Sequence, residues 1–109
     1  MHSAQLAIAA GVQVVNGTDF PADDLDNGCS LAVRELELLV ASGMTPLESI
    51  RAATLIPAAL LGLKDHIGRI APGLSADLIA TRADPVQDST ALREIQVVIS
   101  AGRVVRMSR

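Results

Sequence analysis

At 109 residues the chain is long enough for one small domain but too short for an eight-stranded (β/α)₈ barrel, which takes about 250 residues. Its net charge of −3 and its single aromatic residue, Phe20, offer no basic surface for phosphates and no stacking platform for bases. No apolar run approaches the roughly 18–20 residues of a membrane-spanning helix. We therefore expect neither a nucleic-acid partner nor a membrane partner.

Cysteine usage and the start of the chain predict a cytoplasmic location. Cys29 is the only cysteine, so the chain cannot form an internal disulfide, which is typical of a reducing compartment. The first charged side chain is Asp19, so the positively charged start of a secretory signal peptide is missing. Residues 4–15 are therefore interpreted as part of the fold.

The N-terminal part predicts a helix, a strand and a loop. Residues 2–10 are rich in alanine and are followed by Gly11, which predicts a short helix with a glycine at its end. Residues 12–16 are apolar at both odd and even positions, as in a strand that is covered on both faces. Gly17, Thr18 and Asp19 follow this strand, and the acidic stretch 22–28 is predicted to be a polar loop.

Helices are predicted over 31–42, 45–55 and 57–61. Ser30 can cap the first helix, and Gly43 ends it. The second begins with Thr45-Pro46-Leu47-Glu48, in which Thr45 and Glu48 form a capping box. It cannot pass Pro57 unbroken. The residues expected to face the core are Ala32, Leu36, Leu39, Val40, Gly43, Ile50, Ala53, Thr54, Ala58 and Leu61.

After residue 64 the pattern changes from helical to β, which divides one compact unit into segments 1–64 and 65–109. The second segment predicts strands at 67–70, 77–81, 95–100 and 103–106, one helical turn at 89–94 and a tight turn at Ala101-Gly102. The predicted fold class is mixed α+β with a small antiparallel sheet.

Several short stretches of the sequence, taken in their order and spacing, resemble those of a known protein family. They are Val-Asn-Gly-Thr-Asp at 15–19, IGRIAPGLSADL at 67–78, and residues 35–40, 43–46, 52–54, 57–58, 61–63, 98–99 and 102–105. Together they resemble the C-terminal part of the amidohydrolase superfamily, in the branch of imidazolonepropionase and prolidase-like metal-dependent hydrolases. The resemblance covers nearly all of the chain.

This resemblance implies a place in a larger architecture. Strand 12–16 would be the last strand of a TIM-type (β/α)₈ barrel, and residues 30–62 would be the helices that follow it. Residues 65–109 would be half of a β-sandwich whose other half comes from the N-terminus of a complete enzyme. Asp19 would be the catalytic aspartate that binds the metal, zinc or another divalent ion, and that handles the proton of the attacking water.

The remaining metal ligands of such enzymes have no counterpart in this chain. There is no His-x-His pair, His2 precedes the predicted barrel strand, and His66 and the single lysine, Lys64, follow the barrel segment. A catalytic metal needs about three protein ligands. We therefore expect Asp19 to be the only catalytic and metal-binding residue, no tightly bound metal, and an isolated chain without activity.

Each polar candidate also has a plainer interpretation. Asp19 can be a turn residue whose carboxylate accepts hydrogen bonds from the backbone of residues 17–20. The acidic loop lacks the glycine and distal glutamate of an EF-hand, which favours a solvated loop over a calcium site. The acids of that loop are Asp23, Asp24 and Asp26. His2 is interpreted as a frayed terminal residue, His66 as a surface residue and Cys29 as a buried or inert thiol. Asp77 is expected to order the Pro72-Gly73 turn that precedes it.

Two functions follow from these observations. The first is the C-terminal segment of a hydrolase whose complete relatives cleave C–N bonds of amides, cyclic amides or dipeptides. The alternative is a non-catalytic interaction domain that associates with itself or with a missing N-terminal half. The strands after residue 65 would have open edges, which tend to pair with another chain. This alternative predicts a homodimer or a larger assembly.

Overall fold

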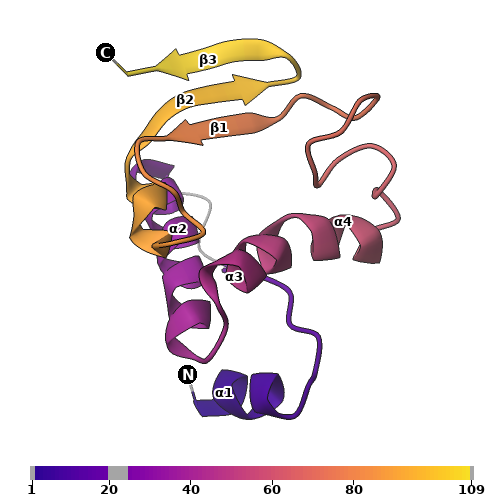
Figure 1. Ribbon diagram of the computed structural model, residues 1–109, viewed down its shortest axis with the longest axis vertical. Coiled ribbons are helices and arrows are strands. Elements are labelled where there is room, and N and C mark those ends of the chain that lie inside the picture. The colour runs from indigo at the N-terminus through magenta and orange to yellow at the C-terminus, as the bar shows by residue number, and fades with distance from the viewer. Residues whose placement is uncertain (1, 20–24, 109) are drawn as a thin grey trace.

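The computed structural model describes residues 2–19 and 25–108, with side chains described for 2–19 and 31–108. The described elements, shown in Figure 1, are α1 (His2–Ala9), α2 (Leu25–Ala41), α3 (Pro46–Ala53), α4 (Leu55–Leu60), β1 (Leu78–Thr81), the 3₁₀ helix η1 (Ser89–Arg93), β2 (Ile95–Ser100) and β3 (Arg103–Met107). This order confirms the predicted mixed α+β class. No helix among the described residues has the length and apolar character needed to cross a membrane.

The helical part begins differently from the prediction. The loop expected at 22–28 is wrong for its second half, because α2 already begins at Leu25 and Ser30 lies within it. Serine is strongly favoured at a helix cap, but its intermediate helix propensity also allows it inside a helix, so Ser30 alone does not mark the helix start. The end of α2 matches the prediction, since the N–H of Gly43 bonds to the Val40 carbonyl at 3.1 Å.

Residues 12–19 have no regular secondary structure, so the predicted strand at 12–16 is wrong. The backbone N–H groups of Val12 and Asn16 bond to the carbonyls of Ala7 and Ala52, at 3.0 and 2.9 Å. A strand needs a ladder of hydrogen bonds to a neighbouring strand. Among the described residues no strand lies beside 12–16, so its apolar pattern alone does not produce one.

The start of α3 confirms the predicted capping box. The Glu48 N–H donates to Thr45 Oγ1 at 3.2 Å, and the Thr45 N–H donates to Glu48 Oε2 at 2.7 Å. The helix ends at Ala53, and α4 begins at Leu55 rather than at Pro57. Because Pro57 has no N–H to offer the Ala53 carbonyl, the regular hydrogen-bond ladder cannot continue across this point.

The sheet is antiparallel, as expected, and its strands lie in the order β1-β2-β3. Ala101 and Gly102, with φ of +49° and +78°, make the tight turn between β2 and β3. The strand expected at 67–70 is absent. Gly68 has φ +100° there, and a Cβ on it would lie 2.6 Å from Ala58 Cβ, so this stretch packs against α4 instead of extending.

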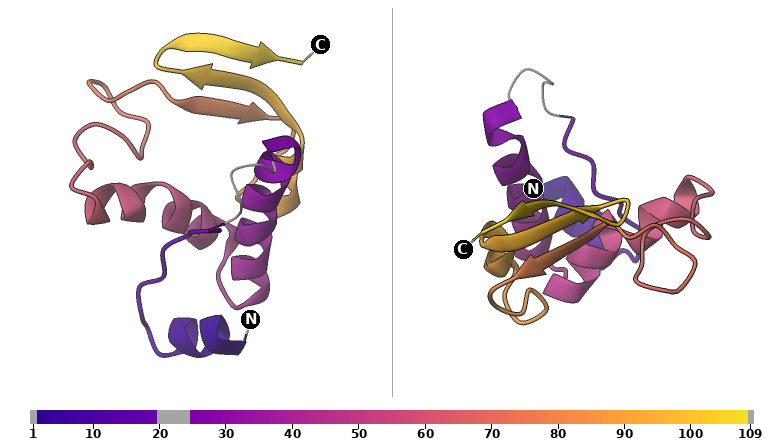
Figure 2. Two further views of the ribbon diagram at one scale, coloured as in Figure 1. Left: turned by 180° about the vertical axis from the view of Figure 1, so that it is seen from behind. Right: turned by 90° about the horizontal axis from the view of Figure 1, so that it is seen from above.

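The helices and the sheet occupy opposite ends of the molecule. The sheet lies at one end of the 40 Å long axis and α1 at the other, and residues 61–77 pass from α4 to β1 on the outside (Figures 1 and 2). Leu39 and Ala58 are buried as predicted, whereas Gly43, Thr54 and Leu61 are exposed, contrary to prediction. Among the described side chains, the buried hydrophobic residues are Val33, Leu39, Ala52, Ala58, Ala91 and Leu92.

Candidate active site

Asp19 lies at the end of the irregular segment that follows α1. Its side chain is exposed, and its φ of +49° is a left-handed conformation that aspartate tolerates better than most residues. The alternative role as a turn residue involves Phe20, which lies outside the described residues. The catalytic and metal-binding role of Asp19 therefore stays a prediction.

Asn16 anchors this segment to α3, and sequence reasoning gave it no role. Its backbone N–H donates to the Ala52 carbonyl, while its side-chain Oδ1 is buried and has no hydrogen-bond partner among the described residues. A buried acceptor without a partner costs about 1–3 kcal/mol. In the sequence, Asn16 is visible only as a polar residue that follows the mainly apolar stretch 12–15. This segment therefore carries one polar side chain at the surface, that of Asp19, and one in its contact with α3, that of Asn16.

Two adjoining clefts lie along the segment, and Gln13 and Ile56 line both of them. The larger, of about 620 Å³, is further lined by Leu55, Ala59, Leu60, Lys64, Asp65 and Arg69. The smaller, of about 320 Å³, is further lined by Ile8, Gly11, Val12, Val14, Met44, Glu48, Arg51 and Ala52. Asp19 lines neither cleft. The concave surface and the candidate catalytic residue therefore lie at different places along the same segment.

The described residues do not fit a metal centre on their own. Among the described side chains, those of residues 2–19 and 31–108, no three His, Cys, Asp or Glu residues are grouped so that they could hold a metal ion. His2 is exposed on α1, and His66 is exposed in the connection between α4 and β1. Asp19 offers one carboxylate, whereas a catalytic metal takes about three protein ligands.

Four predicted candidates lie outside the described side chains. Asp23 and Asp24 lie outside the described residues, and the side chains of Asp26 and Cys29 belong to the undescribed part of α2. The choice between a calcium site and a solvated loop, and the state of the thiol, therefore stay predictions.

Asp77 orders a turn, but not the one expected. Its Oδ1 accepts a hydrogen bond from the backbone N–H of Ala101 at 2.8 Å, which fixes the β2–β3 turn rather than the preceding Pro-Gly turn. That bond, together with a hydrogen bond from Ser75, lowers the pKa of the Asp77 carboxyl below its ordinary value. The role is structural, and it depends on two segments that are far apart in the sequence.

A match to known proteins decides the family. The family model described as "Amidohydrolase family" matches residues 2–105. This chain belongs to the amidohydrolase family. The resemblance inferred from the sequence is thereby confirmed.

Individual relatives agree with this assignment. Over 100 residues, which is 90% of this chain, the chain is 36% identical to ochratoxinase of Aspergillus niger. It is 42% identical to imidazolonepropionase of Hahella chejuensis over 62 residues, 53% of this chain. The crystal structure of an Xaa-Pro dipeptidase with bound methionine in the active site superimposes with a TM-score of 0.84 at 32% identity over 96% of this chain.

The chain matches only a small share of each relative. It spans 20% of ochratoxinase, 15% of imidazolonepropionase and 25% of the Xaa-Pro dipeptidase chain. Most of each relative thus has no counterpart in these 109 residues.

Proposed function

We propose that this chain is the C-terminal segment of a metal-dependent amidohydrolase, and that it contributes Asp19 to the active site. The observation that carries the proposal is the family match across residues 2–105, set against the quarter or less of each relative that the chain spans. The support for Asp19 is its place in the Val-Asn-Gly-Thr-Asp stretch at 15–19, within the residues that the family model matches. In the complete enzyme, segment 12–16 would become a strand only beside the rest of the barrel, and barrel enzymes keep catalytic groups at the ends of their strands.

The proposed reaction is hydrolysis of a C–N bond in an amide, a cyclic amide or a dipeptide. The names of two relatives, an Xaa-Pro dipeptidase and an imidazolonepropionase, support this range of substrates. Zinc or another divalent metal would ionise water at neutral pH in such a site. Since the described residues cannot hold that metal alone, the isolated chain is expected to be inactive. A cytoplasmic location stays a prediction as well.

A chimera tests the contribution of Asp19. The matching quarter of the Xaa-Pro dipeptidase is replaced by this chain, and hydrolysis of an Xaa-Pro dipeptide and metal content are measured. The chimera is expected to be active, and Asp19→Asn is expected to remove activity together with metal. Glu94→Gln, at an exposed acid that lines neither cleft, is the control and is expected to leave both unchanged. Full activity of Asp19→Asn would contradict the proposal.

The isolated chain tests the predicted incompleteness separately. Zinc titration followed by calorimetry is expected to give no tight stoichiometric binding, and amide hydrolysis is expected to be undetectable. Stoichiometric zinc together with turnover would mean that these residues form a complete enzyme.

The exposed sheet favours a second candidate function, a self-associating interaction domain without catalysis. Within the described part of the chain, no residue of β1, β2 or β3 is buried, and both β1 and β3 are edge strands. Unpaired strand edges are templates for another chain. Light scattering on the purified chain tests this function, since a domain of this kind is expected to be larger than one copy.

A further inference from the structure

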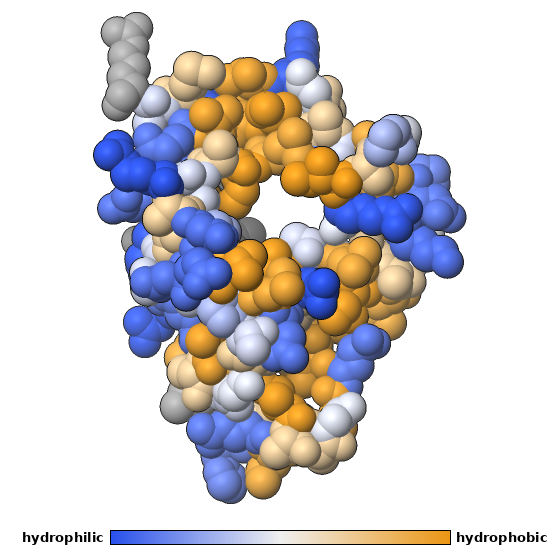
Figure 3. Space-filling model, viewed as in Figure 1, coloured by the Kyte–Doolittle hydropathy of each residue, from blue (hydrophilic) through white to orange (hydrophobic). Residues whose placement is uncertain are grey.

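An asparagine followed by a glycine is a chemically reactive pair, and the chain contains two such pairs. Asn16 precedes Gly17 and Asn27 precedes Gly28, and these are the only asparagines of the sequence. The pair reacts with water alone, whereas the hydrophobic side chains around the opening between the sheet and the helices α3 and α4 (Figure 3) would act only through a partner. The two pairs are therefore sites that the residues of this chain define by themselves.

The reaction of such a pair is the loss of the side-chain amide. The backbone nitrogen of the glycine gives up its proton to water and forms a bond to the asparagine Cγ. The Cγ–Nδ2 bond breaks, the nitrogen takes up a proton and leaves as ammonia, and a five-membered succinimide ring remains. Water then opens the ring at either carbonyl and gives aspartate or isoaspartate. Asparagine is thermolabile in proteins, and glycine favours the attack because it has no Cβ to crowd its nitrogen.

The surroundings of Asn16 leave this attack open. Residues 12–19 have no regular secondary structure, and within the described chain the Gly17 N–H makes no backbone hydrogen bond. Gly17 is exposed, and a Cβ added to it would have no atom within 4 Å beyond its chain neighbours. None of the described residues donates to Asn16 Oδ1, so the side-chain amide is not held by a bond to this oxygen.

Asn27 has the same neighbour but a different backbone. It lies in the first turn of α2 (Leu25–Ala41). The helical backbone angles fix the direction of each peptide N–H along the helix axis, whereas the side chains project outward from the axis. The Gly28 nitrogen can reach the Asn27 Cγ only after the backbone leaves the helical conformation. The helix is therefore expected to slow the reaction at Asn27.

We propose that Asn16 is a site of spontaneous deamidation, at which water converts the asparagine to aspartate and isoaspartate. The product carries a new carboxylate in the same short segment as Asp19, and isoaspartate also lengthens the backbone by a carbon atom. Burying a charge is costly, and Asn16 Oδ1 is buried in the contact with α3. The reaction is therefore expected to loosen this contact and to shift the segment that carries Asp19.

Peptide mass spectrometry on the full 109-residue chain tests the proposal. The chain is incubated in mildly alkaline buffer and then cut into peptides that separate the two asparagines. Each deamidation adds about 1 Da, because a hydroxyl replaces an amino group. Asn16 is expected to react about tenfold faster than Asn27, which corresponds to a difference of about 1.4 kcal/mol in the barrier. In urea, where the helix is lost, the two asparagines are expected to react at similar rates.

Gly17→Ala is the variant that separates the attacking nitrogen from the rest of the segment. Gly17 does not have a positive φ, and the space around it is open, so alanine is expected to fit while its Cβ crowds the nitrogen. The reaction at Asn16 is expected to slow by about tenfold. Gly28→Ala makes the same change beside Asn27 and is the matched control, which is expected to leave the rate at Asn16 unchanged.

Two results would overturn the proposal. One is a wild-type chain in which Asn16 reacts no faster than Asn27 in native buffer, a comparison that needs no variant to fold. The other is a Gly17→Ala chain in which Asn16 reacts as fast as in the wild type. Neither result bears on the Asp19 chimera, so this proposal and the proposed function can fail independently.

Discussion

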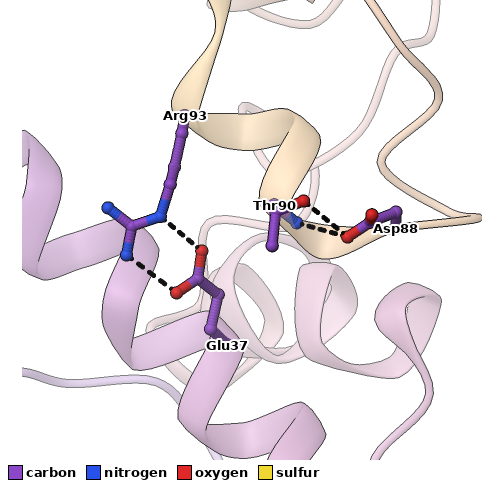
Figure 4. Close-up of polar contacts among 4 residues, drawn as sticks. All are labelled: Glu37, Asp88, Thr90 and Arg93. Atoms are coloured by element: carbon purple, nitrogen blue, oxygen red, sulfur yellow. Dashed lines mark hydrogen bonds and ion pairs between the residues drawn. The ribbon is translucent and has the colours of Figure 1, made fainter.

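Arg93 and Glu37 form a two-point ion pair that joins η1 to α2. Arg93 Nε lies 2.7 Å from Glu37 Oε1, and one terminal nitrogen lies 2.8 Å from Oε2 (Figure 4). Next to this pair, Ala91 and Leu92 of η1 are buried, and Asp88 caps η1 by accepting from the Thr90 N–H at 2.9 Å. The sheet segment is thus attached to the helices by a small apolar contact with a directional ion pair at its rim.

The ion pair predicts a specific dependence of stability on pH. The hydrogen bond from Arg93 lowers the pKa of Glu37 below its ordinary value of 4.5. Because the pKa is lowered in the folded state, this contribution to stability is present above about pH 4.5 and is lost as the pH falls through the folded-state pKa. Glu37→Gln is expected to lower the melting temperature slightly at neutral pH and to lose less stability than the wild type on acidification.

Glu94→Gln is the control for that measurement. Its carboxylate lies 3.9 Å from Arg82, and both side chains are about two-thirds exposed, so little stability is expected from this pair. Thermal unfolding followed from neutral pH to below pH 4 compares the variants. Identical acid sensitivity of Glu37→Gln and the wild type would mean that the ion pair does not stabilise the fold.

Adding a side chain at Gly68 is expected to cause a steric clash, and its cost can be separated from that of backbone strain. Its φ is +100°, and an added Cβ would lie 2.6 Å from Ala58 Cβ and 3.0 Å from the Thr54 carbonyl oxygen. Gly68→Ala is expected to destabilise the fold by about 2–3 kcal/mol, since overpacking typically costs about 1–3 kcal/mol. Gly73→Ala, with φ +87° and open space around it, has the strain without the clash and is expected to cost at most about 1 kcal/mol.

A double variant checks the clash directly. Adding Ala58→Gly to Gly68→Ala removes the nearest atom, although a glycine inside α4 costs about 1 kcal/mol. Chemical denaturation is expected to give a loss for the double variant that is smaller than the sum of the two single losses. If the loss of the double variant equals the sum of the two single losses, the cost of Gly68→Ala does not come from its contact with Ala58 Cβ.

Ala101 is expected to be less favourable than glycine in the β2–β3 turn. Its φ of +49° costs an alanine roughly 1–2 kcal/mol, whereas the greater freedom of glycine in the unfolded chain costs about 0.5–1 kcal/mol. Ala101→Gly is therefore expected to stabilise the fold by about 0.5–1 kcal/mol in chemical denaturation, and it keeps the N–H that Asp77 accepts. Gly102→Ala, at φ +78°, is expected to destabilise instead. A loss of stability in Ala101→Gly would contradict the strain argument.

Sequence reasoning predicted the features that depend on a few neighbouring residues. The Thr45–Glu48 capping box and the Ala101-Gly102 turn are of this kind, since each is complete within four residues. The absent strand at 67–70 depends on the approach of Gly68 to Ala58, and the partner of Asp77 lies 24 residues further on. Contacts between residues this far apart in the sequence leave no pattern among neighbouring residues from which they could be predicted.

The candidate site was predicted in a different way. Asp19 was named through the family resemblance and not through a pattern of ligands, because the other ligands of such a site are not in this sequence. Asn16 was visible in the same motif, but its unpartnered oxygen is a property of the packing against α3. The family could thus be predicted from short motifs, whereas the surroundings of the site could not.

Asn16 itself gives the last prediction. Since Oδ1 is buried and none of the described residues donates to it, replacing the amide by an apolar group of similar size removes an unsatisfied acceptor and keeps the backbone N–H bonded to Ala52. Asn16→Leu is expected to stabilise the isolated chain by about 1 kcal/mol in chemical denaturation. Gln13→Leu, at an exposed polar residue of the same segment, is the control and is expected to change stability by less than about 0.5 kcal/mol. A destabilised Asn16→Leu would mean that this oxygen has a partner in solution, and the search for that partner would then begin with the groups around Asp19.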